Sequence, residues 1–430
     1  MTVENAPAAQ IALAEAAAFA PAPSAPARPI RFVGDSKAFW RLLIRGAALL
    51  AVTLGIYRFW LATDVRRFLW SNTEIAGDNL EYNGTATELL IGFLIAIALL
   101  LPLNLLVFLA ALGMGPVGEF AGVLAFPLLF VLGQFAIFRA RRYRLTRTVL
   151  RGVRCHQTGS AWRYAFCATF WWVLIVLTLG LAYPFAQASL ERYKMRHTHY
   201  GDLPGGFEGS GFRLFLRGLL MWLLVVGPFM IGIGAAIGAV DWDALNRITS
   251  LGGGGDITQV EGLAAGGFIA LTAVSLSVLM VLLLFPVFQA MVLRWWLSGI
   301  RFGELKVTSH LLKRRIYGAY VRFLWYGFLF SLLAGAIGTG VLLAFGVSSN
   351  PAGGIAGEIA GTVATVALYV IVMLGYSTIY QATVKLALWR HGLESVEIEG
   401  LDVLDKVQAA GSPGSAVGEG LADALNVGGI

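Results

Sequence analysis

Long runs of apolar residues alternate with short polar stretches along the chain. Each run is about 20 residues or longer, which is the length that a helix needs to cross roughly 30 Å of hydrocarbon. The pattern predicts an all-α polytopic membrane protein, since the strands of an outer-membrane barrel would alternate over about ten residues. The predicted apolar segments cover residues 39–62, 88–112, 120–138, 164–188, 212–240, 266–291, 316–345 and 357–388.

Two of these segments contain a break. The sequence Thr-Leu-Gly ends at Gly55 in the first segment and at Gly180 in the fourth, where Pro184 follows. A glycine costs about 1 kcal/mol in a helix interior and a proline about 3 kcal/mol. Both segments are also flanked by basic residues at each end, which conflicts with simple alternating crossings. We therefore predict about six full transmembrane helices plus two broken, re-entrant segments. The alternative is eight ordinary spans.

The composition agrees with a membrane protein. Hydrophobic residues make up 57% of the chain and charged residues 13%, whereas a soluble domain carries about 25% charged residues. The net charge of +7 comes from basic loops that the six-span arrangement places together on the cytoplasmic side. This distribution predicts cytoplasmic N- and C-termini and basic loops near lipid headgroups. It disfavours nucleic acid as a partner.

A polar cassette recurs after the apolar segments. In its clearest copy, Arg66 and Arg67 end a helical run beside Asp64, which suggests a local ion pair, and Gly77 and Gly84 mark turns. The stretches between these glycines alternate with period two, which predicts short β-hairpins. A lone hairpin is marginally stable, so we expect the copies to pair into a small cytoplasmic sheet. The weaker copies carry the basic residues Arg142, Arg192, Arg294 and Lys385.

A polar residue lies near the end of several apolar segments. Four glutamines precede a basic residue by four or five positions, and they are Gln134, Gln187, Gln289 and Gln381. Each can bond a neighbouring helix, which is worth about 0.6 kcal/mol; alternatively, the four line a path through the membrane. Asn104 is the polar candidate in the middle of the second segment. Ionisable residues are otherwise scarce within the segments, which argues against an ion-coupled pump.

The pattern divides the chain into five parts. No basic stretch precedes an apolar core at the N-terminus, so a disordered tail is expected there and not a signal peptide. The predicted parts are an Ala/Pro-rich cytoplasmic tail (1–36), membrane repeat A with hairpins (37–160), membrane repeat B (161–315), a final helix pair and hairpin (316–400), and a C-terminal cytoplasmic tail (401–430).

The sequence lacks the motifs of common enzyme chemistry. It contains no Gly-x-x-x-x-Gly-Lys phosphate loop, no Gly-x-Ser-x-Gly elbow with matching partners and no His-Glu-x-x-His. The five histidines lack the spacing of a metal site. The two cysteines lack Cys-x-x-Cys spacing, and cytoplasmic thiols stay reduced. We therefore expect no catalytic residue, cofactor or metal, and no enzyme.

The first cassette carries a family resemblance. The stretches TLGIYRFW and RRFLWSNTEIAGDNLEYNGTATELLIGF resemble the signature of the YjgN-like bacterial inner-membrane proteins, a family of unknown function. The terminal GEGLADALNVGGI is similar to a tail found in some members. The resemblance runs from about Phe39 to the end of the chain. It implies a location in the bacterial inner membrane and adds no catalytic residue.

Two hypotheses for the function remain at this stage. The first is a transporter or channel-like protein for a small or apolar substrate, which internal repeats and paired broken segments favour. The second is a non-transporting scaffold that interacts with lipids or the cell envelope, favoured by the scarcity of charge in the membrane. A continuous polar cavity that reaches Asn104 and the glutamines would favour the first. The sequence leaves the oligomeric state open.

Overall fold

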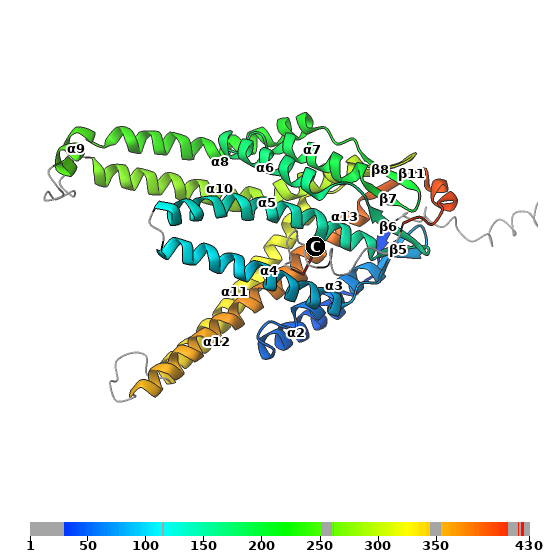
Figure 1. The fold of residues 1–430 in the computed structure, drawn as a ribbon, viewed down its shortest axis with the longest axis horizontal. Helices are drawn as coiled ribbons and strands as arrows, with labels where there is room; N and C mark the ends of the chain where they lie inside the picture. Colours follow the sequence, from blue (N-terminus) through cyan, green and yellow to red (C-terminus); the bar gives the residue numbers. More distant parts are fainter. Residues whose placement is uncertain are drawn as a thin grey trace, which may run out of the picture.

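The computed structural model describes residues 30–113, 116–250, 260, 262–344, 354–411, 420 and 423–424. The long helices extend toward one end of the molecule, and the short strands lie together at the opposite end (Figure 1). Most of the predicted N-terminal tail lies outside the described residues. The prediction of disorder up to residue 36 is nevertheless wrong at its end, because Ile30–Phe32 forms strand β1.

The helices follow one another in pairs that contact each other, and each pair leads back to the strands. The pairs are α2 (Ser36–Val52) with α3 (Arg58–Ser71), α4 (Ala86–Gly113) with α5 (Pro116–Thr146), α6 (Ala161–Leu177) with α7 (Tyr183–Arg196), α8 (Gly211–Ala239) with α10 (Leu263–Gly299), and α11 (Lys313–Ala344) with α12 (Gly354–Tyr380). A short helix, α9 (Trp242–Ser250), follows α8. A π-helix, η3 (Gln381–Lys385), joins α12 to α13 (Leu386–Glu394), and a 3-10 turn, η4 (Leu401–Lys406), follows the last strand.

Four helical stretches of the described chain are long and apolar enough to cross a bilayer. They are Gly211–Ala239, Leu263–Gly299, Lys313–Val341 and Ile359–Glu394. Their outer faces expose large apolar side chains such as Leu220, Phe268 and Leu282. A water-soluble protein rarely exposes so much contiguous apolar surface. The structure thus agrees with the predicted class of α-helical membrane protein.

The two Thr-Leu-Gly sequences form the same turn between helices. Leu54 and Gly55 have φ angles of 50° and 92°, and Leu179 and Gly180 have 50° and 94°. The left-handed conformation favours glycine, because a Cβ atom is strained there. In the first turn the Thr53 hydroxyl donates to the Leu49 carbonyl at 2.7 Å and accepts from the Tyr57 amide at 3.0 Å.

The Thr178 hydroxyl makes the matching contacts in the second turn. It donates to the Leu174 carbonyl at 2.7 Å and accepts from the Ala182 amide at 3.0 Å. Each threonine thereby ends one helix and starts the next. The two breaks are alike even though Pro184 follows the second one and not the first.

Eleven short strands lie between the helix pairs in the described chain, and all their pairings are antiparallel. We call them the strand layer. Positive φ angles at Ala76 and Gly77 form the turn between β2 and β3, as two-residue hairpin turns require. The strands are β1, β2 (Thr73–Ile75), β3 (Asp78–Asn79), β4 (Glu81–Tyr82), β5 (Thr148–Leu150), β6 (Val153–Gln157), β7 (Thr198–Tyr200), β8 (Leu203–Phe207), β9 (Ile300–Phe302), β10 (Leu305–Ser309) and β11 (Val396–Glu399).

The two ends of the strand layer meet. One sheet has the order β1-β2-β3 and the other runs from β4 through the remaining strands to β11. Only Leu80 separates β3 from β4. At the far ends, Ile30 of β1 and Val396 of β11 are buried in one apolar cluster with Leu305 and Val307. The N-terminal and C-terminal strands therefore lie against each other.

The strand layer makes one thiol unreactive. Burial raises the pKa of the Cys155 thiol on β6 to about 12, so only about 10⁻⁴ of it is thiolate at pH 8. We expect maleimide to label native Cys155 at least a hundred times more slowly than a Cys introduced at the exposed Glu81 of β4, with the rate rising about tenfold per pH unit. Mass spectrometry of the labelled protein measures both rates. Fast labelling of native Cys155 at pH 7 would contradict this expectation.

Candidate functional site

An arginine near the end of a helix pair reaches the backbone carbonyl just before the next helix. We call these contacts the arginine clamps. In three of them the donor and acceptor are 17 residues apart. The clamps run from Arg67 to Gly84 (3.0 Å), from Arg142 to Gly159, from Arg192 to Gly209 (3.3 Å) and from Arg390 to Gly34 (2.6 Å). In a related contact, the Arg294 guanidinium donates to the Ser309 carbonyl at 3.1 Å.

The last clamp corrects the sequence alignment of the fifth cassette. The alignment places Lys385 opposite the clamp arginines, but Arg390 makes the contact. Arg390 lies six residues before Val396, the first residue of β11, just as Arg67 lies six residues before Thr73 of β2. The spacing from the following strand therefore identifies the clamp arginine better than the spacing from the glutamine does, because the π-helix η3 begins at Gln381.

The clamp glycine is a packing requirement at three positions. A Cβ atom at Gly34 would lie 2.5 Å from the ring of Phe32, one at Gly84 would lie 2.6 Å from the ring of Tyr82, and one at Gly209 would lie 2.4 Å from the ring of Phe207. The aromatic ring two residues earlier folds back over the glycine. This contact orients the carbonyl that the arginine binds.

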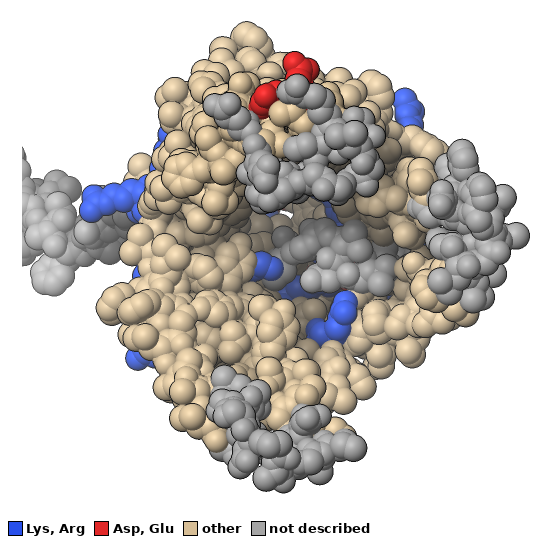
Figure 2. Space-filling view, turned by 90° about the vertical axis from the view of Figure 1, so that its left-hand side faces the viewer, with Lys and Arg blue, Asp and Glu red and all other residues tan. Residues whose placement is uncertain are grey.

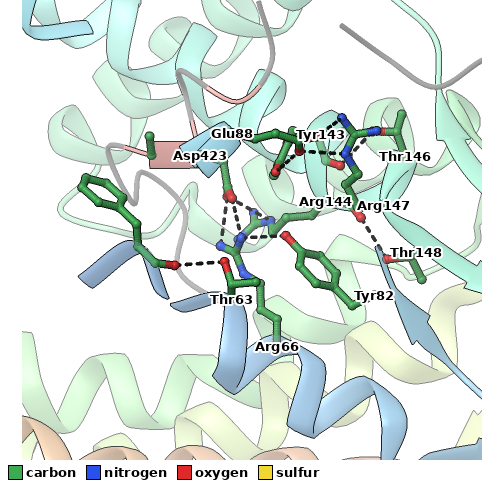
Figure 3. Close-up of polar contacts among 12 residues, drawn as sticks. Thr63, Arg66, Tyr82, Glu88, Tyr143, Arg144, Thr146, Arg147, Thr148 and Asp423 are labelled. Carbon is green, nitrogen blue, oxygen red and sulfur yellow. Dashed lines mark hydrogen bonds and ion pairs between the residues drawn. The ribbon is translucent and has the colours of Figure 1, made fainter. Parts of the chain in front are cut away.

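Arg66 forms a buried ion pair with the C-terminal tail and not with Asp64, contrary to the local pairing that the sequence suggests. Both guanidinium nitrogens donate to Asp423, one of them at 3.1 Å, and Arg66 also donates to the Tyr82 hydroxyl at 3.1 Å. Arg66 is 3% exposed and Asp423 is 4% exposed. The Arg144 Nε atom lies 3.7 Å from the same carboxylate. Figure 3 shows the carboxylate between the two arginines.

A second carboxylate site lies beside the first. The Tyr143 hydroxyl donates to Glu88 at 2.7 Å, and Arg147 donates to both oxygens of the same carboxylate at 3.0 and 3.1 Å (Figure 3). Such bidentate contacts are the stronger kind of ion pair. They hold the start of α4 against the end of α5.

Three of the four predicted glutamines line one central cavity of about 710 Å³. Gln187 comes from α7, Gln289 from α10 and Gln381 from η3. Val65 and Leu69 of α3 also line the cavity, so four helix pairs contribute to its wall. The Tyr320 hydroxyl donates to the Gln289 carbonyl oxygen at 2.6 Å, and the Gln381 amide donates to the Ser377 hydroxyl at 3.2 Å. π-Helical turns such as η3 are frequent at functional sites.

Charged residues complete the polar part of the central cavity. Lys385 and Glu191 lie in its wall. Burial raises the pKa of the Glu191 carboxyl, but the charges of Lys194 and Arg141 outweigh burial and hold that pKa below its usual value. Glu191 therefore stays ionised at neutral pH. Seen from the free ends of the long helices, the molecule is hollowed between them, and Lys and Arg side chains lie in the hollow (Figure 2).

Two of the polar residues predicted within the apolar segments, Gln134 and Asn104, lie away from this cavity. Gln134 is buried on α5 and is not part of the cavity wall. Asn104 is exposed on α4, where its side-chain amide donates to the Leu100 carbonyl of the same helix at 2.8 Å. A helix can satisfy a polar side chain in this way without any cavity. The cavity thus reaches the glutamines of three helices but not Asn104.

The histidines of the strand layer form a stacked pair. The rings of His156 and His199, which face each other across β6 and β7, lie 4.9 Å apart. Within the described parts of the chain, no three His, Cys, Asp or Glu residues cluster as a metal site would require.

The fold places the protein in the class of predominantly α-helical membrane proteins, because four helical stretches of the described chain are long and apolar enough to cross a bilayer. The chain belongs to the DUF898 family of bacterial proteins of unknown function, whose model matches residues 27–424. The YjgN-like proteins are this family, so the resemblance seen in the first cassette is confirmed. No curated protein and no solved structure matches the chain.

Proposed function

We propose that this protein is a bacterial inner-membrane transporter or channel-like protein whose central cavity takes a small molecule. The observation that carries the proposal is the cavity of about 710 Å³, into which three helix pairs place Gln187, Gln289 and Gln381. Ligand sites are commonly hollows of this size with apolar walls and a few polar groups. Polar groups inside a membrane protein are costly and tend to mark substrate paths.

A cyclic repeat supports the same function. We infer that the chain is built from five copies of a helix pair followed by strands, with the fifth copy completed by β1 from the N-terminus. The clamp from Arg390 to Gly34 joins these chain ends in the way that Arg67 and Gly84 join neighbouring copies. Transporters are often built from such internal repeats around a central site.

The arrangement in the membrane follows from helix length and charge. Each of α2 and α6 has 17 residues and spans about 26 Å, less than the roughly 30 Å hydrocarbon core. The two broken pairs are therefore re-entrant in this proposal, and α4, α5, α8, α10, α11 and α12 cross. The arginine-bearing helix ends beside the strand layer then lie on the cytoplasmic side with both termini, close to lipid headgroups.

Thiol accessibility tests whether the cavity holds water. In a Cys155→Ser, Cys167→Ser background, we expect Gln289→Cys and Gln381→Cys to react with a small water-soluble thiosulfonate at least ten times faster than Asn104→Cys. Asn104 is the matched control, because it is a polar helical residue that faces outward. The loss of free thiol in native membranes is measured by mass spectrometry.

The same experiment separates the two candidate functions. Reaction of the cavity cysteines in inverted vesicles or in spheroplasts shows from which side the cavity opens. Three equally slow sites would mean a sealed bundle, which overturns the transport proposal. The scaffold hypothesis would then be preferred, with the strand layer and the basic helix ends beside it as its interaction surface.

A further inference from the structure

A second hollow lies on the outer side of the helices, and we call it the side groove. It has a volume of about 360 Å³ and lies between the turn that joins α6 to α7, α8 and α10. Its walls are almost entirely apolar, with residues such as Leu181, Leu214 and Val281. The Trp222 indole borders it and donates to the Leu179 carbonyl at 2.7 Å, which fixes the ring against the turn.

The packing of α8 against α10 explains why the side groove exists. At Gly232 the two helices approach so closely that a Cβ atom would lie 2.1 Å from that of Ala273. At Gly218, fourteen residues earlier on α8, the nearest neighbour would be the flexible end of Met291 at 3.7 Å. The two helices are therefore in tight contact at Gly232, whereas the small side chain at Gly218 leaves room for the groove.

The outer faces beside the groove are those of membrane-spanning helices. Leu216 and Leu220 of α8 and Leu282 of α10 are each more than half exposed, and both helices are long and apolar enough to cross a bilayer. An apolar hollow between such faces is open to lipid and not to water. The occupant that this surface fits is an acyl chain.

The side groove adjoins the central cavity. Tyr183, Phe285 and Phe288 belong to the walls of both hollows. The rings of Tyr183 and Phe288 lie 5.7 Å apart, and Phe285 packs edge-on against Tyr320, which in turn binds Gln289. These aromatic side chains therefore lie where an apolar hollow meets one that carries amide and charged groups.

From this juxtaposition we infer that the substrate is an amphiphile, with an acyl chain in the side groove and an anionic head group in the central cavity. The inference rests on the proposed function and names its substrate class. Gln289 and Gln381 supply hydrogen-bond donors for the head group. Lys385 supplies positive charge, and within the described chain no carboxylate forms an ion pair with it. The charge of Glu191 in the same wall is balanced by Arg141 and Lys194. The substrate enters sideways from the bilayer between α7, α8 and α10.

Binding of defined amphiphiles to the purified full-length protein tests the inference. The probe is cis-parinaric acid, a fluorescent fatty acid, and the competitors are laurate with a carboxylate head, lauroyl lysophosphatidylglycerol with a phosphate head and uncharged monolaurin. We expect the probe to bind and both anionic amphiphiles to compete at least ten times better than monolaurin. Competition by the carboxylate or the phosphate compound alone identifies the head group that the cavity takes.

Two substitutions on one helix provide a matched comparison. Gly218→Leu fills the side groove and should weaken binding of the probe at least tenfold. Gly227→Leu on the same helix has open space around its Cβ position and lies outside the groove, so it should change binding less than twofold. Lys385→Gln should remove the preference for anionic head groups while leaving the weak affinity for monolaurin unchanged.

The outcomes separate this inference from the proposed function. Bound lysophosphatidylglycerol should protect Gln289→Cys from the thiosulfonate reagent at least fivefold. A reactive Gln289→Cys with no probe binding, or equal effects of the two glycine substitutions, overturns the amphiphile inference and leaves the transport proposal standing. A sealed Gln289→Cys overturns both.

Discussion

Replacing Asp423 by Ala is expected to lower the free energy of unfolding by about 3–5 kcal/mol. The Asp423 carboxylate is almost fully buried and receives two hydrogen bonds from Arg66, with Arg144 close by. The neighbouring Ala424 carbonyl also accepts from Arg58 at 2.7 Å. Removing the carboxylate leaves the buried Arg66 charge without its counter-charge, and this accounts for most of the loss.

The measurement is unfolding of the purified protein in detergent, followed by tryptophan fluorescence. The control is Asp405→Ala, because Asp405 is also a tail carboxylate paired with an arginine, Arg151, but it is 73% exposed. Exposed pairs contribute about 0–1 kcal/mol. Adding Arg66→Met to Asp423→Ala should recover at least half of the loss, because the unpaired charge of the fully buried Arg66 is then removed. Equal losses in the two aspartate variants would refute a structural role for the buried pair.

The contact between Arg66 and Asp423 also shows where sequence reasoning stops. The two residues are 357 positions apart, and a single aspartate in an Ala/Gly-rich tail carries no local signal of burial. The sequence could identify the membrane segments and the two Thr-Leu-Gly breaks, because both depend on local hydrophobicity and on backbone preferences. It could not identify which tail residue enters the core, because that depends on the assembled helices.

The candidate site was predicted in part for a similar reason. Gln187, Gln289 and Gln381 were singled out by their position near the inner ends of helices, and the structure brings them to one cavity. Gln134 occupies a comparable position in the sequence, yet α5 holds its side chain in a buried position outside the cavity. Hydrophobic periodicity does not show in which direction a residue points from a largely apolar helix, because the faces of such a helix differ little in hydrophobicity.

The side groove left no signal in the sequence at all. In the structure Gly232 makes a close contact with the neighbouring helix, whereas Gly218 borders the groove. Which of two glycines on one helix does which depends on the neighbouring helix and not on its own sequence position. The glycine substitutions described above therefore test a feature that only the assembled helices define.

The other large effect is expected where the chain ends meet, at Phe32→Ala, which should cost about 3–5 kcal/mol. Phe32 is 7% exposed in a cluster with Phe39 and Leu69, and the Arg390 guanidinium lies 5.3 Å from its ring centre. Its loss removes packing from β1 and from the clamp at Gly34 together.

Arg31 provides the matched control for Phe32. It precedes Phe32 on the same strand and forms an exposed ion pair with Glu74. Arg31→Ala removes this pair and should lower the free energy of unfolding by less than about 1 kcal/mol. If β1 closes a ring of five copies, Phe32→Ala should also speed amide exchange in β2 and β11, on both sides of the junction, because β1 pairs with β2 and shares a core cluster with β11. Faster exchange in β2 alone would mean that β1 only extends one sheet. Faster exchange in both strands would mean that the N-terminal strand joins the first copy to the fifth, so that the cavity wall depends on a contact between the two ends of the chain.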